Sequence, residues 1–197
     1  MPRLSNLKAY YDDLLLMEKQ SPRELVTEWS SALVDEIKSV FRQAYAQAKL
    51  KDSTLALRPG SLPQSVGNQI EPHIATALAA CFAGWQLKPC VGSGYPDQII
   101  CDQTRKLPVE FKSTGQWSDR DTNRCVLTSS SAKLRAQFAA PIYHLLVTVK
   151  FDRAEDIATI RNLRLDFLSP STPVNVRFEG SVTQRILARA THPIDEL

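Results

Sequence analysis

The chain has 197 residues and a formal net charge of +3, from 24 Lys or Arg against 21 Asp or Glu. This length fits one domain, and a content of 43% hydrophobic and 23% charged residues is typical of a globular protein. No run approaches the roughly 18 apolar residues of a membrane helix, and acids beside the Leu14–Leu16 run argue against a signal peptide. We therefore expect a cytoplasmic protein without a membrane partner. Its weak positive charge permits a polyanionic partner without requiring one.

The cysteines and histidines show no spacing that indicates a zinc site or a nucleophilic hydrolase. The four cysteines form no CxxC or CxxH pair, which predicts reduced thiols in a cytoplasmic setting. The three histidines are scattered, and His144, at the start of an apolar strand, is expected to be a hydrogen-bonded core residue. No GxSxG motif is present.

Residues 1–60 are expected to form a helical N-terminal region. A short helix is predicted from about Ser5 to Glu18. Ser21-Pro22-Arg23-Glu24 has the pattern of a capping box with proline in the first turn, which predicts a long helix from there to about Lys49. The two helices would form a dimerisation or DNA-clasping layer, or else simply pack on the core. Residues 51–64, with two prolines and a glycine, predict a loop.

The next segment, SVGNQIEPHIATALAACFAGW, has apolar residues at helical spacing and a plausible stop at Gly84. Pro72 should lie in the first turn or else kink the helix. Glu71 shares a stripe with Ile74 and Leu78, so its carboxylate should point toward the core. A buried charge is costly unless it is paired or bound to a metal, which favours an active-site role. A capping or salt-bridge role is the alternative.

From Gln86 the apolar period changes to two, which predicts strands at 86–91, 97–102 and 107–113, with a turn at 104–106 closing a hairpin. On the third strand Val109 and Phe111 face one way, whereas Glu110 and Lys112 face the other. Two adjacent ionisable residues on one strand face are better explained by a functional site than by a solvated edge.

A polar loop (114–128) should lead into a helix from Ala132 to about Ala140, followed by a central strand at 142–151. Further strands are predicted at 163–168 and 174–178, and a last helix at 182–190. The expected fold class is α/β, with a central mixed β-sheet flanked by helices in a single domain. Its parts would be the N-terminal region, a core at 65–151, and C-terminal strands and helix at 152–197.

Asp97, Glu110 and Lys112 carry the chemistry of phosphodiester hydrolysis. Mg²⁺ prefers hard oxygen ligands, which two carboxylates supply, and the carbonyl of Phe111 is placed to add a third. Lys112 would orient or deprotonate the attacking water, or stabilise charge on the phosphate. Glu71 would accept an outer hydrogen bond or bind another metal ion.

Pro96-Asp97 followed by Glu110-Phe111-Lys112 resembles the motif of the PD-(D/E)XK nuclease superfamily, and residues 65–151 resemble the order of its common core. Within that superfamily the chain looks most like a type II restriction endonuclease. The resemblance implies a restriction-endonuclease-like core and Mg²⁺-dependent cleavage of double-stranded DNA at a short palindrome by a homodimer, with a cognate DNA methyltransferase in the same system. It also implies that Asp97 and Glu110 bind the metal, that Lys112 is the catalytic lysine and that Glu71 is an auxiliary acid. Asp102 is a less favoured rival for Asp97.

DNA contacts are predicted on the segment after the third strand. A helix N-terminus suits phosphate binding, which indicates Ser129, Ser130, Ser131 and Lys133. The loop before it carries side chains of the kind that read G and A edges, namely Arg120, Asn123 and Arg124. The alternative is a capped surface helix after a solvated loop.

Two other functions remain open from the sequence. A repair nuclease or junction resolvase would use the same chemistry but recognise DNA structure rather than sequence. A non-catalytic DNA-binding module would carry the motif by coincidence.

Overall fold

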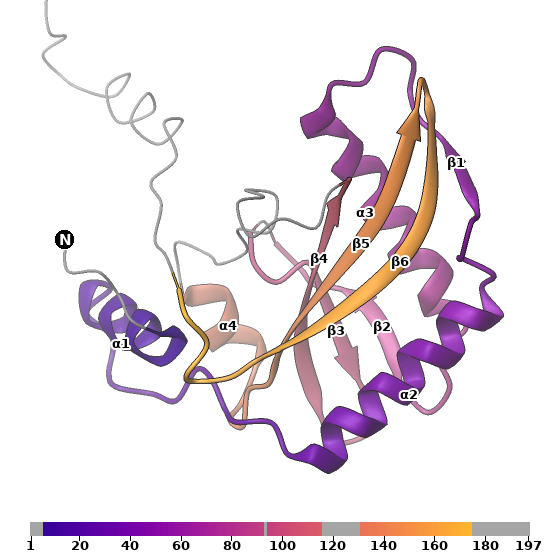
Figure 1. The fold of residues 1–197 in the computed structure, drawn as a ribbon. Coiled ribbons are helices and arrows are strands. Elements are labelled where there is room, and N and C mark those ends of the chain that lie inside the picture. Colours follow the sequence, from indigo (N-terminus) through magenta and orange to yellow (C-terminus); the bar gives the residue numbers. More distant parts are fainter. Residues whose placement is uncertain (1–5, 93, 116–130, 175–197) are drawn as a thin grey trace, which may run out of the picture.

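The computed structural model describes residues 6–92, 94–115 and 131–174. These residues form an α/β fold in which a mixed six-stranded sheet is flanked by helices (Figure 1). The helices are α1 (Leu7–Met17), α2 (Ser31–Gln47), α3 (Pro63–Ala79) and α4 (Ala132–Gln137). The strands are β1 (Thr54–Ala56), β2 (Gln86–Pro89), β3 (Gln98–Cys101), β4 (Lys106–Thr114), β5 (His144–Ala154) and β6 (Ile157–Leu168).

The strand order in the sheet is β1-β6-β5-β4-β3-β2. β4 and β5 are parallel, and every other neighbouring pair is antiparallel. The predicted hairpin of β3 and β4 and the inner position of the 142–151 strand are therefore confirmed. The strand predicted at 163–168 is part of the longer β6, which pairs with β5 over almost its whole length.

The prediction of a helix starting at the Ser21–Glu24 capping box was wrong. α2 starts at Ser31, after Ser30 accepts a hydrogen bond from the amide of Leu33 at 3.3 Å. The preceding segment instead packs on the rest of the chain. Leu25 and Val26 are buried there, and the amide of Thr27 donates to the carbonyl of Ile142 at 2.8 Å. These distant contacts outweigh the local capping pattern.

Three smaller differences concern element boundaries. The predicted loop 51–64 contains β1, which pairs with β6. α3 begins at Pro63, so Pro72 lies inside the helix and not in its first turn. α4 ends at Gln137, before the predicted Ala140. The predicted helix at 182–190 and nearly all of the strand at 174–178 lie outside the described residues.

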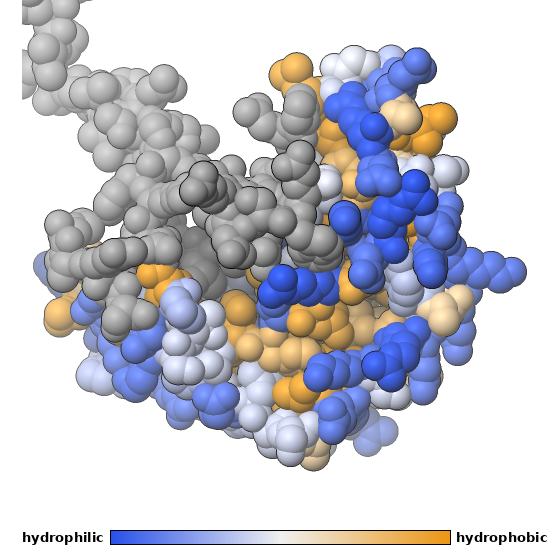
Figure 2. Space-filling model, viewed as in Figure 1, coloured by the Kyte–Doolittle hydropathy of each residue, from blue (hydrophilic) through white to orange (hydrophobic). Residues whose placement is uncertain are grey.

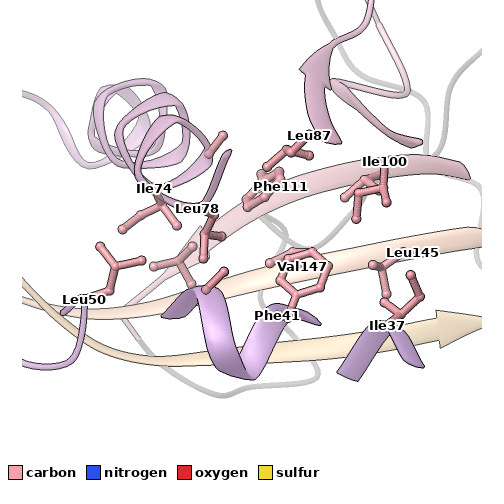
Figure 3. Packing of buried hydrophobic residues seen from close by; sticks show 14 of the residues in the cluster. Ile37, Phe41, Leu50, Ile74, Leu78, Leu87, Ile100, Phe111, Leu145 and Val147 are labelled. Atoms are coloured by element: carbon pink, nitrogen blue, oxygen red, sulfur yellow. The ribbon is translucent and has the colours of Figure 1, made fainter. Parts of the chain in front are cut away.

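The larger hydrophobic core lies between the sheet and the helices α2 and α3. Figure 3 shows Phe41 of α2 and Leu78 of α3 directed toward Phe111 of β4 and Val147 of β5. These residues belong to one buried cluster that also takes in β2, β3 and β6. Because Val109 and Phe111 are in it, the opposite face of β4 carries Glu110 and Lys112, as predicted.

A second buried cluster forms where α1, α4 and the segment around Leu25 meet. Figure 1 shows α1 and α4 beside each other, away from α2. In the same view, Figure 2 shows hydrophilic and apolar surface interspersed over the described residues. Among these residues, no helix combines the length and the apolar character needed to cross a membrane.

The core assignment predicts that Leu78→Ala lowers the free energy of unfolding by about 2–5 kcal/mol, because Leu78 is 0% exposed in the larger cluster. Leu16→Ala is the control, since Leu16 is 76% exposed on α1 and should change stability by less than about 0.5 kcal/mol. Urea unfolding followed by circular dichroism measures both. Equal effects of the two substitutions would contradict this packing.

Candidate functional site

The register of β3 against β4 brings Asp97 to Glu110. Gln98 pairs with Val109 in the last step of this antiparallel ladder, so the next residues out are Asp97 and Glu110. β3 begins at Gln98, and the amide of Asp97, just before it, donates to Oε2 of Glu110 at 3.0 Å. A side-chain carboxylate thus fixes Asp97 immediately outside the ladder.

Lys112 joins these two carboxylates from the same face of β4. Its Nζ lies 2.6 Å from Oε1 of Glu110 and 3.9 Å from Oδ2 of Asp97. The exposed fraction of the side chain rises from 6% for Glu110 to 20% for Lys112 and 42% for Asp97. The three predicted residues therefore form one group that is buried at Glu110 and open to solvent at Asp97.

The pKa values of Glu110 and Lys112 are shifted from their ordinary values. Burial raises the pKa of Glu110 to about 7, and the charge of Lys112 only partly offsets that effect. Burial alone would lower the pKa of Lys112, but the carboxylates of Glu110, Glu71 and Asp97 outweigh it and raise the pKa above its usual range. Lys112 is therefore a cation at neutral pH, while Glu110 is close to its titration midpoint.

Glu71 approaches β4 from α3, on the other side of the strand. Its Oε1 accepts a hydrogen bond from Oγ of Ser113 at 2.9 Å. Burial raises the pKa of Glu71, whereas Lys112 and the Ser113 hydroxyl lower it. Glu71 thus interacts electrostatically with Lys112, but its hydrogen-bond partner is Ser113.

Gly67 has a packing role beside Glu71. A Cβ at position 67 would lie 3.0 Å from both Oε1 of Glu71 and Oγ of Ser113. Glycine in a helix interior costs about 1 kcal/mol relative to alanine. The closeness of these two polar atoms explains why α3 carries a glycine one turn before Glu71.

Tyr95 and His144 anchor the chain just before Asp97, and no pattern in the sequence indicates that they pair. The hydroxyl of Tyr95 bonds to Nδ1 of His144, and Nε2 of His144 bonds to the carbonyl of Leu25 at 2.6 Å. Because a carbonyl only accepts, Nε2 carries the proton and Nδ1 accepts from Tyr95. Burial lowers the pKa of His144 to about 4, so the ring is neutral. His144 is a hydrogen-bonded core residue, as predicted.

Most of the residues predicted to contact DNA lie outside the described residues, and the other two make contacts within the protein. Arg120, Asn123, Arg124, Ser129 and Ser130 lie outside the described residues. Of the two that are described, Ser131 is 0% exposed and its amide donates to Oε1 of Glu18 at 2.9 Å.

The amine of Lys133, in turn, lies against backbone carbonyls of the loop before Asp97. Both side chains thus make contacts within the protein, and their contact with DNA stays a prediction.

The donor set at Asp97 and Glu110 fits Mg²⁺, which commonly takes one or two carboxylates and completes its shell with water and substrate oxygens. The ring of Phe111 is buried in the core, so the further ligand predicted at this residue would have to be its backbone carbonyl. Among the described residues, no three His, Cys, Asp or Glu side chains form a group able to hold a metal ion.

Comparisons with protein-family models, with curated proteins and with solved structures found no match for the chain. What the site can do is therefore inferred from its residues and their geometry.

The raised pKa of Glu110 predicts a specific pH dependence of stability. The folded carboxyl titrates at about 7 and the unfolded one near 4.5, so its ionisation opposes folding increasingly between these values. By linkage this penalty reaches on the order of 3 kcal/mol above pH 7. The free energy of unfolding of Glu110→Gln relative to wild type should rise from pH 4.5 to 7 and then level off.

Urea unfolding at several pH values, with a chelator present, tests this expectation. Glu28→Gln, at an exposed position, controls for the loss of one carboxylate. A difference between Glu110→Gln and wild type that stays constant from pH 4.5 to 8 would contradict the assignment.

Proposed function

We propose that the protein is a Mg²⁺-dependent endodeoxyribonuclease that hydrolyses phosphodiester bonds of double-stranded DNA at a short specific sequence, in the manner of type II restriction endonucleases. The observation that carries the proposal is the placement of Asp97, Glu110 and Lys112. Two carboxylates and a lysine meet at the point where β3 stops pairing with β4. The same residues form the PD-(D/E)XK pattern in the sequence.

The arrangement of elements adds support for a restriction-endonuclease-like core. α3, β2, β3, β4, α4 and β5 follow one another along the chain, which is the order expected for that core. β4, which carries Glu110 and Lys112, is an inner strand with an antiparallel neighbour on one side and a parallel one on the other. An inner strand provides a rigid support for groups that must be held closely.

Asp97 and Glu110 would hold the metal ion, with the carbonyl of Phe111 as the third protein ligand. Bound Mg²⁺ would polarise the phosphodiester and make water a stronger nucleophile. Glu110 must be ionised to serve as a ligand, and because its pKa is about 7, metal affinity should increase as the pH rises through neutrality. The exposed side of Asp97 leaves a path for the DNA.

Lys112 would act as a cation close to the reacting phosphate. Its raised pKa keeps it protonated before the substrate arrives, so donation of hydrogen bonds to a phosphate oxygen or to the attacking water is favoured over proton abstraction. Glu71 would have a supporting role, because it interacts with Lys112 electrostatically while its hydrogen bond goes to Ser113.

For such an enzyme we expect a homodimer, which cuts both strands of a palindrome, and a cognate DNA methyltransferase that protects the host DNA.

We predict that the purified protein cuts a large phage genome into discrete bands with Mg²⁺ and leaves it intact with EDTA. Lys112→Met should reduce the cleavage rate at least about 100-fold, because it removes the cation beside the metal ligands. Lys106→Met is a matched control, since Lys106 lies exposed on the same face of β4 and should retain cleavage. Asp97→Ala should abolish cleavage.

The pattern of products separates the alternatives. Sequencing the ends of discrete bands would give the recognition site, whereas cutting confined to junctions or damaged DNA would favour a repair nuclease. Wild-type cutting by Lys112→Met would contradict the role given to the lysine. Binding of DNA without any Mg²⁺-dependent cutting would favour a non-catalytic DNA-binding module.

A further inference from the structure

Lys133 lies on α4 and makes three hydrogen bonds to the backbone. Its Nζ lies 2.9 Å from the carbonyl oxygen of Gly92, 2.7 Å from that of Gly94 and 2.6 Å from that of Pro96. An ammonium group has three N–H donors, and three carbonyls are available to accept them. A phosphate could take one of these donors only by displacing a carbonyl of the loop that leads into Asp97.

The backbone conformation of this loop allows its carbonyl groups to converge on the ammonium of Lys133. Gly92 and Gly94 have φ angles of +91° and +78°, a region that other residues rarely adopt. These conformations turn the carbonyls of the loop toward one point on α4. We refer to residues 90–92 and 94–97 as the Asp97 loop.

Gln137 holds the start of the same loop from one turn further along α4. Its Nε2 donates to the carbonyl of Val91 at 2.9 Å, and its Oε1 accepts from the thiol of Cys90 at 3.1 Å. Residues four apart lie on one face of a helix, so Lys133 and Gln137 form a single row against the loop. The amide of Cys90 in turn donates to the carbonyl of Asp97 at 2.8 Å, which closes the loop on itself.

α4 is itself fixed by the N-terminal segment. A helix of six residues is not stable alone in water. The guanidinium of Arg23 donates to the carbonyls of Arg135 at 3.2 Å and of Phe138 at 2.8 Å, and Glu18 accepts hydrogen bonds from the amide and hydroxyl of Ser131. Lys133 and Gln137 therefore extend from a support that is held at both ends.

We propose that Lys133, assisted by Gln137, is a positioning residue that holds Asp97 in place against Glu110, and that it is not a DNA contact. The catalytic consequence rests on the proposed nuclease function, but the hold on the loop does not. An ammonium that binds three carbonyls fixes the backbone up to Pro96, one residue before Asp97. Without it, Asp97 would keep its contacts with Glu110 and Lys112 but would lose the backbone support on its N-terminal side before a metal ion binds.

The test compares Lys133→Met with wild type and with Lys106→Met. Methionine keeps most of the length of the side chain but has no donors. In Lys133→Met, the amides of Cys90 and Asp97 should exchange with solvent at least about tenfold faster, because their partners are no longer held. Mg²⁺ affinity, measured by calorimetry, should weaken about 10–100-fold, the usual loss when a group supporting a metal ligand is removed.

Activity and DNA binding separate positioning from phosphate contact. Lys133→Met should lower the single-turnover cleavage rate at saturating DNA, whereas its DNA affinity in metal-free buffer and the salt dependence of that affinity should stay as in wild type. A reduced salt dependence, with exchange at Asp97 and the cleavage rate unchanged, would show that Lys133 contacts phosphate. That result would overturn the proposal.

Amide exchange keeps this test independent of the nuclease hypothesis. If wild type neither binds Mg²⁺ nor cuts DNA, faster exchange at Asp97 in Lys133→Met would still support the hold on the loop, and the proposed function would fail alone. If Lys133→Met does not fold, Gln137→Met removes the neighbouring contacts to Cys90 and Val91 and should show the same effect on exchange to a smaller degree. Unchanged exchange in a folded variant would overturn the proposal.

Discussion

The hydrogen bond from the amide of Asp97 to Glu110 is the interaction on which the candidate site depends. It forms where the ladder between β3 and β4 stops, so a side-chain carboxylate meets the first residue outside the ladder. Through this bond Glu110 orients Asp97 with one oxygen and keeps its second oxygen for Lys112.

This arrangement buries the carboxylate of Glu110, where its ionised form is unfavourable. Glu110 is 4% exposed, and a buried carboxylate is tolerated only with partners that compensate for lost hydration. Lys112 supplies part of that compensation, and the pKa of about 7 shows that it does not supply all of it. A bound cation would supply more.

Much of the sheet and of the central site follows from the sequence because short-range patterns determine them. Alternation along 107–113 separates Phe111 from Glu110 and Lys112, and the turn between β3 and β4 sets the register that brings Asp97 to Glu110. The non-helical segment at 21–30 could not be found in this way. Its capping pattern is a local signal, whereas the contacts that overrule it, such as that of Thr27 with Ile142, join residues far apart in the chain.

The roles of Lys133 and Ser131 show the same limit. A lysine and a serine at the start of a helix are typical of phosphate binding, and nothing in the neighbouring residues indicates that loop carbonyls and Glu18 occupy them instead. The pairing of Tyr95 with His144 likewise cannot be predicted before β3 and β5 are known to lie in one sheet. Residue type and spacing predicted the group formed by Asp97, Glu110 and Lys112, but not the contacts that support it.

The contacts between the N-terminal segment and the region around α4 have a consequence for the order of assembly. Glu18 bonds to Ser131, Arg23 to Phe138 and Leu25 to His144, at separations of 113, 115 and 119 residues. Closing such long loops costs chain entropy before any contact repays it, so pairings of this kind form slowly. On the ribosome, where the chain emerges from its N-terminus, residues 18–25 must wait for partners made more than a hundred residues later. Until residues 131–144 have been made, a nascent chain therefore has Asp97 and Glu110 without the contacts through which α4 supports the loop before Asp97.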